Sequence, residues 1–196
     1  MTLSKALVPT QSLPVRALMV LGGTAFIALA AQVSVPMIPV PMTLQTLAIL
    51  IVGLSYGARM GALTVAAYLA EGAMGLPVFA NGMNGLAFAG PTAGFLLGFV
   101  GMAWAAGFAA DRGVKGLVPV ALVALAVSAL LYVPGVAWAM AADSLFGLDA
   151  SKWGADSLAS IWTWYMAPFL PGDAVKAVIA ALVVSGGWAA LKGRRA

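Results

Sequence analysis

The sequence predicts an all-α membrane protein with six transmembrane helices and both termini in the cytoplasm. Hydrophobic residues make up 63% of the 196 residues and charged residues only 8%, whereas about a quarter of the residues in a soluble domain are charged. Several apolar stretches approach the ~20 residues that a helix needs to cross a hydrocarbon core of about 30 Å. We expect residues 1–196 to form a single membrane domain.

The basic residues predict the orientation of the spans. Eight of the ten lie near the chain ends or in two short connecting loops: Lys5, Arg16, Arg59, Arg112, Lys115, Lys192, Arg194 and Arg195. Loops on the cytoplasmic side carry an excess of Lys and Arg. The pattern therefore predicts a multi-pass protein of the cytoplasmic (inner) membrane, with five of the six acidic residues, all but Asp111, on the outer side.

Six apolar stretches are predicted to be the spans, at about residues 15–31, 43–55, 60–74, 90–110, 117–142 and 171–191. Pro36, Pro39 and Pro41 separate the first two, because proline cannot continue a helix. A Gly- and Asn-rich loop at 75–85 separates the third from the fourth. Residues 143–157 are polar and follow the fifth. No internal repeat is evident, so the sequence does not favour an inverted-repeat transporter.

Two segments allow a second interpretation. The stretch from Arg16 to Ala28-Leu29-Ala30 resembles a secretory signal with a small-residue cleavage site, but small residues also serve helix packing, and we expect a transmembrane helix. Residues 158–170 contain Trp162, Trp164 and Tyr165. These aromatics fit a belt at the membrane interface and equally fit the cover of a ligand pocket.

The composition excludes several kinds of chemistry. Without Cys or His, the chain has no thiolate nucleophile, no Ser-His-Asp triad and no His or Cys ligand for a metal. No G-x-x-x-x-G-K-[ST] motif occurs, so a P-loop is absent and any ATP must be used by another subunit. The net charge of +4 reflects topology and not a nucleic-acid surface. We expect no cofactor.

Asp173 and Lys176 form the most informative polar pair. They lie at i and i+3, on one face of the helix that begins near Pro171. A charge at membrane depth is costly unless it is paired or faces a polar cavity. One interpretation is a self-satisfied pair that caps the helix, with Asp173 favoured at its N-terminus. The interpretation that we prefer is a site for a small polar ligand that needs an acceptor and a donor.

Three further polar residues are candidates for ligand contact. Gln45 enters an apolar span just after Thr43 and needs hydrogen-bond partners there, which a neighbouring helix or a ligand can supply. Asn81 and Asn84 flank glycines and first indicate turns. Their amides also carry both donors and an acceptor, which suits an amide-like or ureido ligand.

Four stretches together resemble one protein family. They are Val40-Pro41-Met42-Thr43-Leu44-Gln45-Thr46-Leu47, then Tyr68 with Gly75-Leu76-Pro77-Val78-Phe79-Ala80, then Gly90-Pro91-Thr92-Ala93-Gly94-Phe95-Leu96-Leu97-Gly98-Phe99, and Pro171-Gly172-Asp173-x-x-Lys176. The family is BioY, the biotin-specific substrate-binding (S) component of energy-coupling factor (ECF) transporters. The resemblance extends from the first span to the last.

The resemblance implies six helices with a biotin pocket near the outer face. Asp173, Lys176, Gln45 and one of the two asparagines, Asn81 or Asn84, match its ligand-contacting residues. The thiophane ring and valeryl chain of biotin need apolar walls, which the side chain of Phe79 can supply.

The resemblance also implies partners, namely a transmembrane coupling subunit, ATPase subunits and the surrounding lipids. The family docks through an Ala-x-x-x-Ala face of the first helix. The nearest match in this chain is Thr24-x-x-x-Ala28, which differs from that pattern by a threonine at its first position.

Other functions remain in competition with biotin uptake. An S component for a different small vitamin differs only in its ligand. An intramembrane enzyme is disfavoured by the missing His and Cys and by the few buried acids, and a purely structural membrane subunit is a further alternative. The sequence leaves open whether copies of the chain associate with one another.

Overall fold

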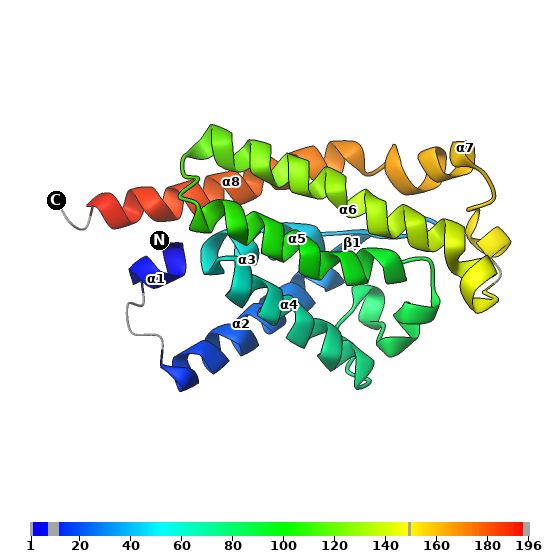
Figure 1. Ribbon diagram of the computed structural model, residues 1–196, viewed down its shortest axis with the longest axis horizontal. Helices are drawn as coiled ribbons and strands as arrows, with labels where there is room; N and C mark the ends of the chain where they lie inside the picture. The colour runs from blue at the N-terminus through cyan, green and yellow to red at the C-terminus, as the bar shows by residue number, and fades with distance from the viewer. Residues whose placement is uncertain (1, 8–11, 149, 194–196) are drawn as a thin grey trace.

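The computed structural model describes residues 2–7, 12–148 and 150–193 and consists mostly of helices (Figure 1). The α-helices are α1 (Leu3–Leu7), α2 (Leu13–Gln32), α3 (Gln45–Tyr56), α4 (Ala58–Ala73), α5 (Ala93–Asp111), α6 (Leu117–Phe146), α7 (Leu158–Ile161) and α8 (Leu170–Gly193). The shorter elements are strands β1 (Ser34–Val35) and β2 (Met42–Thr43), 3-10 turns η1 (Ala80–Gly82), η2 (Gly85–Ala89) and η3 (Ala150–Trp153), and π-helical turn η4 (Trp162–Met166).

The six predicted spans coincide with α2, α3, α4, α5, α6 and α8, with bounds within a few residues. Two details differ from the prediction. Helix α6 continues to Phe146, into the stretch predicted to be a polar loop, and residues 3–7 form an additional short helix. An all-helical fold is otherwise confirmed, apart from the two-residue strands.

Four of these helices, α2, α5, α6 and α8, are long and apolar enough to cross a membrane. Helix α3 is apolar but has 12 residues, which at 1.5 Å per residue is about 18 Å. It is therefore shorter than a hydrocarbon core of about 30 Å. The count of six spans stays a prediction.

The segment between α2 and α3 is irregular and lies against the bundle. β1 and β2 pair antiparallel, with Ser34 opposite Thr43 and Val35 opposite Met42. The turn between them contains the three prolines and a cis peptide bond at Ile38-Pro39. Irregular backbone is tolerated at membrane depth only where it is buried in protein or lines a cavity, and this segment lines a cavity described below.

Helix α1, the start of α2, the end of α5, the start of α6 and the end of α8 lie at one end of the bundle, at the left in Figure 1, and basic residues lie in or beside these segments. In the described part of the chain these are Lys5, Arg16, Arg59, Arg112, Lys115 and Lys192, all within, next to or near the helix ends that meet there. At this end Asp111 accepts a hydrogen bond from the Ala58 amide at 2.9 Å. Arg194, Arg195 and Asp149, which the sequence analysis also used, lie outside the described residues.

Glycines allow α5 and α6 to pack closely. A Cβ on Gly94 would lie 2.3 Å from the Pro134 carbonyl oxygen, and one on Gly135 would lie 2.4 Å from the Phe95 ring. Real Cβ atoms essentially never approach so closely. This contact holds the Phe95 ring edge-on against Tyr132, with ring centroids 6.2 Å apart, and thereby positions one wall of the cavity.

We expect Gly94→Ala to lower the thermal unfolding temperature, because the new methyl group meets the backbone of α6 and not a flexible side chain. Gly101→Ala in the same helix is the matched control, since nothing lies within 4 Å of a Cβ there and alanine favours a helix by about 1 kcal/mol over glycine. Thermal unfolding of the purified protein in detergent measures both. Equal stability of the two variants would contradict the close packing of α5 against α6.

Candidate functional site

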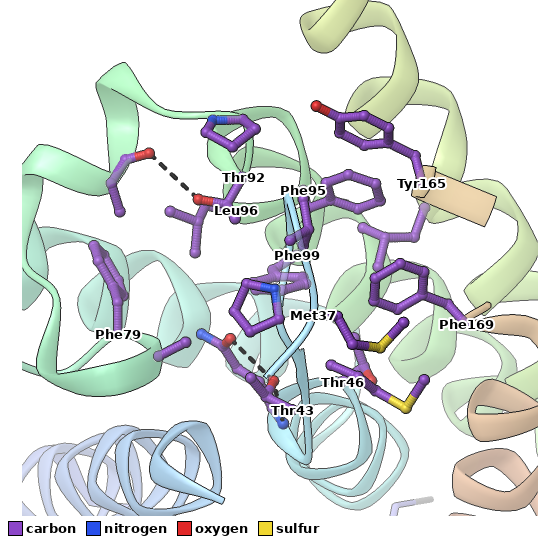
Figure 2. Close-up of a pocket in the computed structure, with 18 of the residues that line it drawn as sticks. Met37, Thr43, Thr46, Phe79, Thr92, Phe95, Leu96, Phe99, Tyr165 and Phe169 are labelled. Atoms are coloured by element: carbon purple, nitrogen blue, oxygen red, sulfur yellow. Dashed lines mark hydrogen bonds between the residues drawn. The ribbon is translucent and has the colours of Figure 1, made fainter. Parts of the chain in front are cut away.

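A cavity of about 360 Å³ opens between α3, α5, α6, α8 and the two irregular segments at 36–43 and 79–92. Its size is typical of a pocket for a small molecule. Figure 2 shows Phe79 on one side and Phe95, Phe99, Tyr165 and Phe169 on the other, with Thr43 and Thr46 below them in this view. Most of the wall is therefore apolar and aromatic.

One part of the wall carries opposite charges. Lys176 and Asp173 line the cavity from the first turns of α8, and Lys176 Nζ lies 3.2 Å from Asp173 Oδ1. The exposed fraction of the side chain is 8% for Lys176 and 17% for Asp173. The Tyr132 hydroxyl, on α6, donates to the other carboxylate oxygen, Oδ2, at 2.6 Å. The predicted pairing of Asp173 with Lys176 is confirmed.

The pair keeps capacity for a ligand. An ammonium group has three donors, and within the described residues Lys176 uses one of them, on Asp173. Each carboxylate oxygen has more than one lone pair, so Asp173 can still accept hydrogen bonds besides those from Lys176 and Tyr132. The arrangement thus offers donors and acceptors side by side on an otherwise apolar wall.

Gln45 connects the cavity to a neighbouring helix. It is 4% exposed and lines the cavity. Its Nε2 donates to the Tyr68 hydroxyl at 2.5 Å, and that hydroxyl donates to the Val78 carbonyl at 2.9 Å. The interhelical bond that the sequence analysis considered for Gln45 is therefore present, and it holds the segment that carries Phe79.

The Phe79 ring is fixed by three contacts. It is 2% exposed and meets Tyr68 and Phe88 edge-on, at centroid distances of 5.3 and 5.5 Å. The third contact is with Gly72, where a Cβ would lie 2.1 Å from the ring. The predicted apolar wall at Phe79 is in place at the cavity.

The two candidate asparagines have different surroundings. Asn81 lines the cavity, adopts a positive φ of 57°, and accepts a hydrogen bond from Ser34 Oγ at 2.9 Å. Asn84 does not line the cavity, and its Oδ1 accepts from the Leu86 amide at the start of η2. Its side chain is a local cap, so Asn81 alone of the two stays a candidate for ligand contact.

The aromatic segment at 158–170 divides between the cavity and the surface, and its role as a membrane-interface belt stays a prediction. Tyr165 and Phe169 are buried and line the cavity. Trp162 and Trp164 are about half exposed, at 53% and 50%, and point away from the core. The change from an α-helical to a π-helical turn at 162–166 lies within this segment.

Sequence reasoning missed several polar residues of the wall, among them Tyr132 and Thr46. Tyr132 lies in the middle of an apolar span, and nothing local connects it with Asp173, which is 41 residues away. Thr46 lines the cavity, and its hydroxyl is buried without a hydrogen-bond partner in the structure. An unpaired buried hydroxyl is uncommon, which makes Thr46 an additional candidate for ligand contact.

The structure does not favour the predicted docking face on α2. Thr24 is 3% exposed, and its hydroxyl donates to the Leu21 carbonyl within the same helix. Ala28 is half-buried and packs against the core. The face of α2 that is open carries Gly22, Ala25 and Leu29 instead, because the small residues at 24 and 28 serve packing inside this chain.

Comparisons with known proteins agree with this architecture. Residues 4–193 match the family described as the BioY family. The chain is a member of the BioY family. Among the similar proteins, the Biotin transporter BioY of Rhizobium etli is 38% identical over 164 residues, covering 79% of this chain and 81% of that protein. The Biotin transporter BioY of Rhodobacter capsulatus is 40% identical over 163 residues, covering 76% and 81%.

A solved structure of similar fold is described as the S-component for biotin from an ECF-type ABC transporter. It matches with a TM-score of 0.69, covering 90% of this chain and 93% of that chain, at 22% identity. At this identity the likeness concerns the fold. The family resemblance predicted from the four sequence stretches is thus confirmed for this BioY-family chain.

We expect Tyr68→Phe to destabilise the protein, because it leaves Gln45 Nε2 and the Val78 carbonyl without their partner. Each unsatisfied buried group costs about 1–3 kcal/mol. Tyr56→Phe is the matched control: the Tyr56 hydroxyl makes a single bond, to the Met19 carbonyl at 3.2 Å. Thermal unfolding should drop more for Tyr68→Phe, and an equal drop would mean that the Gln45–Tyr68–Val78 chain contributes nothing.

Proposed function

We propose that this chain binds biotin in the 360 Å³ cavity and takes it up across the cytoplasmic membrane as the substrate-binding component of an ECF-type transporter. The observation that carries the proposal is the buried Asp173–Lys176 pair, joined by Tyr132, on the wall of an otherwise aromatic cavity. Membership of the BioY family and the names of its similar proteins support the same ligand.

The cavity suits the parts of biotin. The ureido ring has two N–H donors and a carbonyl acceptor, which complement a carboxylate and an ammonium group that lie together. The thiophane ring and valeryl chain match the apolar walls around Phe79 and Phe95. The valerate carboxylate needs a donor, and the candidates are Thr46, Gln45 and Asn81.

We further propose that the chain works with a transmembrane coupling subunit and ATPases. The sequence contains no P-loop, so the energy of ATP has to reach it through partners. Close helix approach requires small residues at the contact. The open face of α2, with Gly22 and Ala25, meets this requirement better than Thr24 and Ala28 do.

Replacing either charged residue of the pair should weaken biotin binding. A lost hydrogen bond to a charged group costs about 1.5–3 kcal/mol, and each 1.4 kcal/mol is about tenfold in affinity. Asp173→Asn and Lys176→Met should each lower the affinity about tenfold or more, measured by isothermal titration of the purified protein with biotin.

Asp156→Asn and Lys5→Met are the controls, because both side chains are exposed and away from the cavity. Wild-type affinity in folded Asp173→Asn and Lys176→Met would show that the pair only caps α8. Tight binding of another small vitamin in the same titration, with none of biotin, would favour the alternative S-component function.

Cysteine labelling tests the orientation of the chain in the membrane. Because the sequence contains no native cysteine, only the introduced cysteine can react. A cysteine placed at position 150 should react with an impermeant reagent added to intact cells. A cysteine at position 115 should react only after the membrane is opened, because basic loops stay in the cytoplasm. The opposite labelling pattern would overturn the proposed topology.

A further inference from the structure

A second cavity, of about 410 Å³, lies at the basic end of the bundle. It is bounded by Ala6 of α1, by Lys115 and Gly116 before α6, and by the last turns of α8 around Trp188 and Lys192. Figure 1 shows α1 close to the C-terminal part of α8. The 16 residues from Lys176 to Lys192 correspond to about 24 Å of helix, so this cavity is remote from the proposed biotin site.

The cavity is electropositive. Lys115 Nζ lies 4.1 Å from the centroid of the Trp188 ring, and Lys192 is exposed at the rim. Within the described part of the chain, neither lysine forms an ion pair. Asp111, the nearest carboxylate along the chain, is hydrogen-bonded to the Ala58 amide. Among the described residues, these two cations thus face the cavity without a carboxylate paired to them.

Two further features of the cavity favour an anion. Gly116 lines the wall immediately before the first residue of the 30-residue helix α6, and the N-terminus of a helix attracts negative charge through its free amides and dipole. Ser185 also lines the cavity, and its hydroxyl is buried with no hydrogen-bond partner in the structure. Buried hydroxyls normally have a partner, and an anion oxygen in the cavity would supply it.

The surroundings of the cavity are those of a membrane interface. Large apolar side chains are exposed one turn away on both bounding helices, including Val118 and Leu122 on α6 and Leu182 on α8, at 67%, 61% and 53%. Just after the end of α5, the Arg112 guanidinium lies 4.4 Å from the centroid of the Phe108 ring. Trp residues such as Trp188 are enriched at the headgroup level, and Lys and Arg side chains near helix ends also reach it. An anion at this level that also covers the exposed apolar chains is a lipid.

The geometry points to a binding site for the phosphate group of an anionic phospholipid, held by Lys115, Lys192 and Ser185 with the acyl chains along α6 and α8. Basic pockets between helices at this side of a membrane bind such headgroups. The lipid would connect α1, α6 and α8 at the end of the bundle where partner subunits that use ATP have to act.

Native mass spectrometry of the full chain in detergent tests this site. Phosphatidylglycerol should be retained more strongly than phosphatidylcholine with the same acyl chains. Each lysine near an anionic headgroup contributes about fivefold in affinity, so the preference should be largely lost in the double variant Lys115→Gln with Lys192→Gln. Lys5→Gln, which removes an exposed lysine outside the cavity, should keep it.

Ser185→Ala provides a second measurement. It should lower phosphatidylglycerol retention severalfold without lowering the unfolding temperature, because the hydroxyl has no hydrogen-bond partner among the described residues. Equal retention of the two lipids, or a preference that survives in the double variant, would overturn the proposal. A second outcome would also overturn the proposal. If glycerol phosphate or inorganic phosphate bound as tightly as the lipid and with the same dependence on the two lysines, the cavity would be a site for a soluble anion.

Discussion

The contact between Asp173 and Lys176 is the constraint on which the rest of the site depends. Two charges that are 17% and 8% exposed are tolerated in an apolar surrounding only when they are paired and their remaining groups find partners. This requirement draws the Tyr132 hydroxyl of α6 toward the start of α8. It also leaves a polar strip on a wall that aromatic rings otherwise form. The pair at 173 and 176 is therefore both a structural necessity and the most specific chemical feature of the cavity.

Where the cavity lies follows from the shortness of α3. A helix of 12 residues leaves part of the membrane depth to other structure, and the β1–β2 hairpin with its proline turn fills that space without closing it. The glycines of α5 and α6 and Gly72 of α4 then bring Phe95 and Phe79 to opposite sides. The same irregular backbone that precedes the short helix α3 lines the cavity.

The helices could be predicted from the sequence because membrane spans depend on local hydrophobicity, and their bounds agree to within a few residues. Asp173 and Lys176 could be predicted as a pair because a spacing of three places both on one helix face. Tyr132 could not, since its partner lies on another helix, 41 residues away. The choice between Asn81 and Asn84 depended on a backbone turn that either residue could have formed. The role of Thr24 could not be predicted, because small-residue spacing indicates close packing but not whether the neighbour is a partner or the same chain.

The mutual neutralisation of Asp173 and Lys176 has an electrical consequence. Moving one elementary charge through a potential of 100 mV involves about 2.3 kcal/mol, but opposite charges 3.2 Å apart move together and the net work nearly cancels. The pair therefore adds almost no net charge to this wall of the cavity. If the cavity holds a ligand with a charge of its own, as proposed for biotin, the membrane potential would act on the charge of the ligand and hardly on the pair.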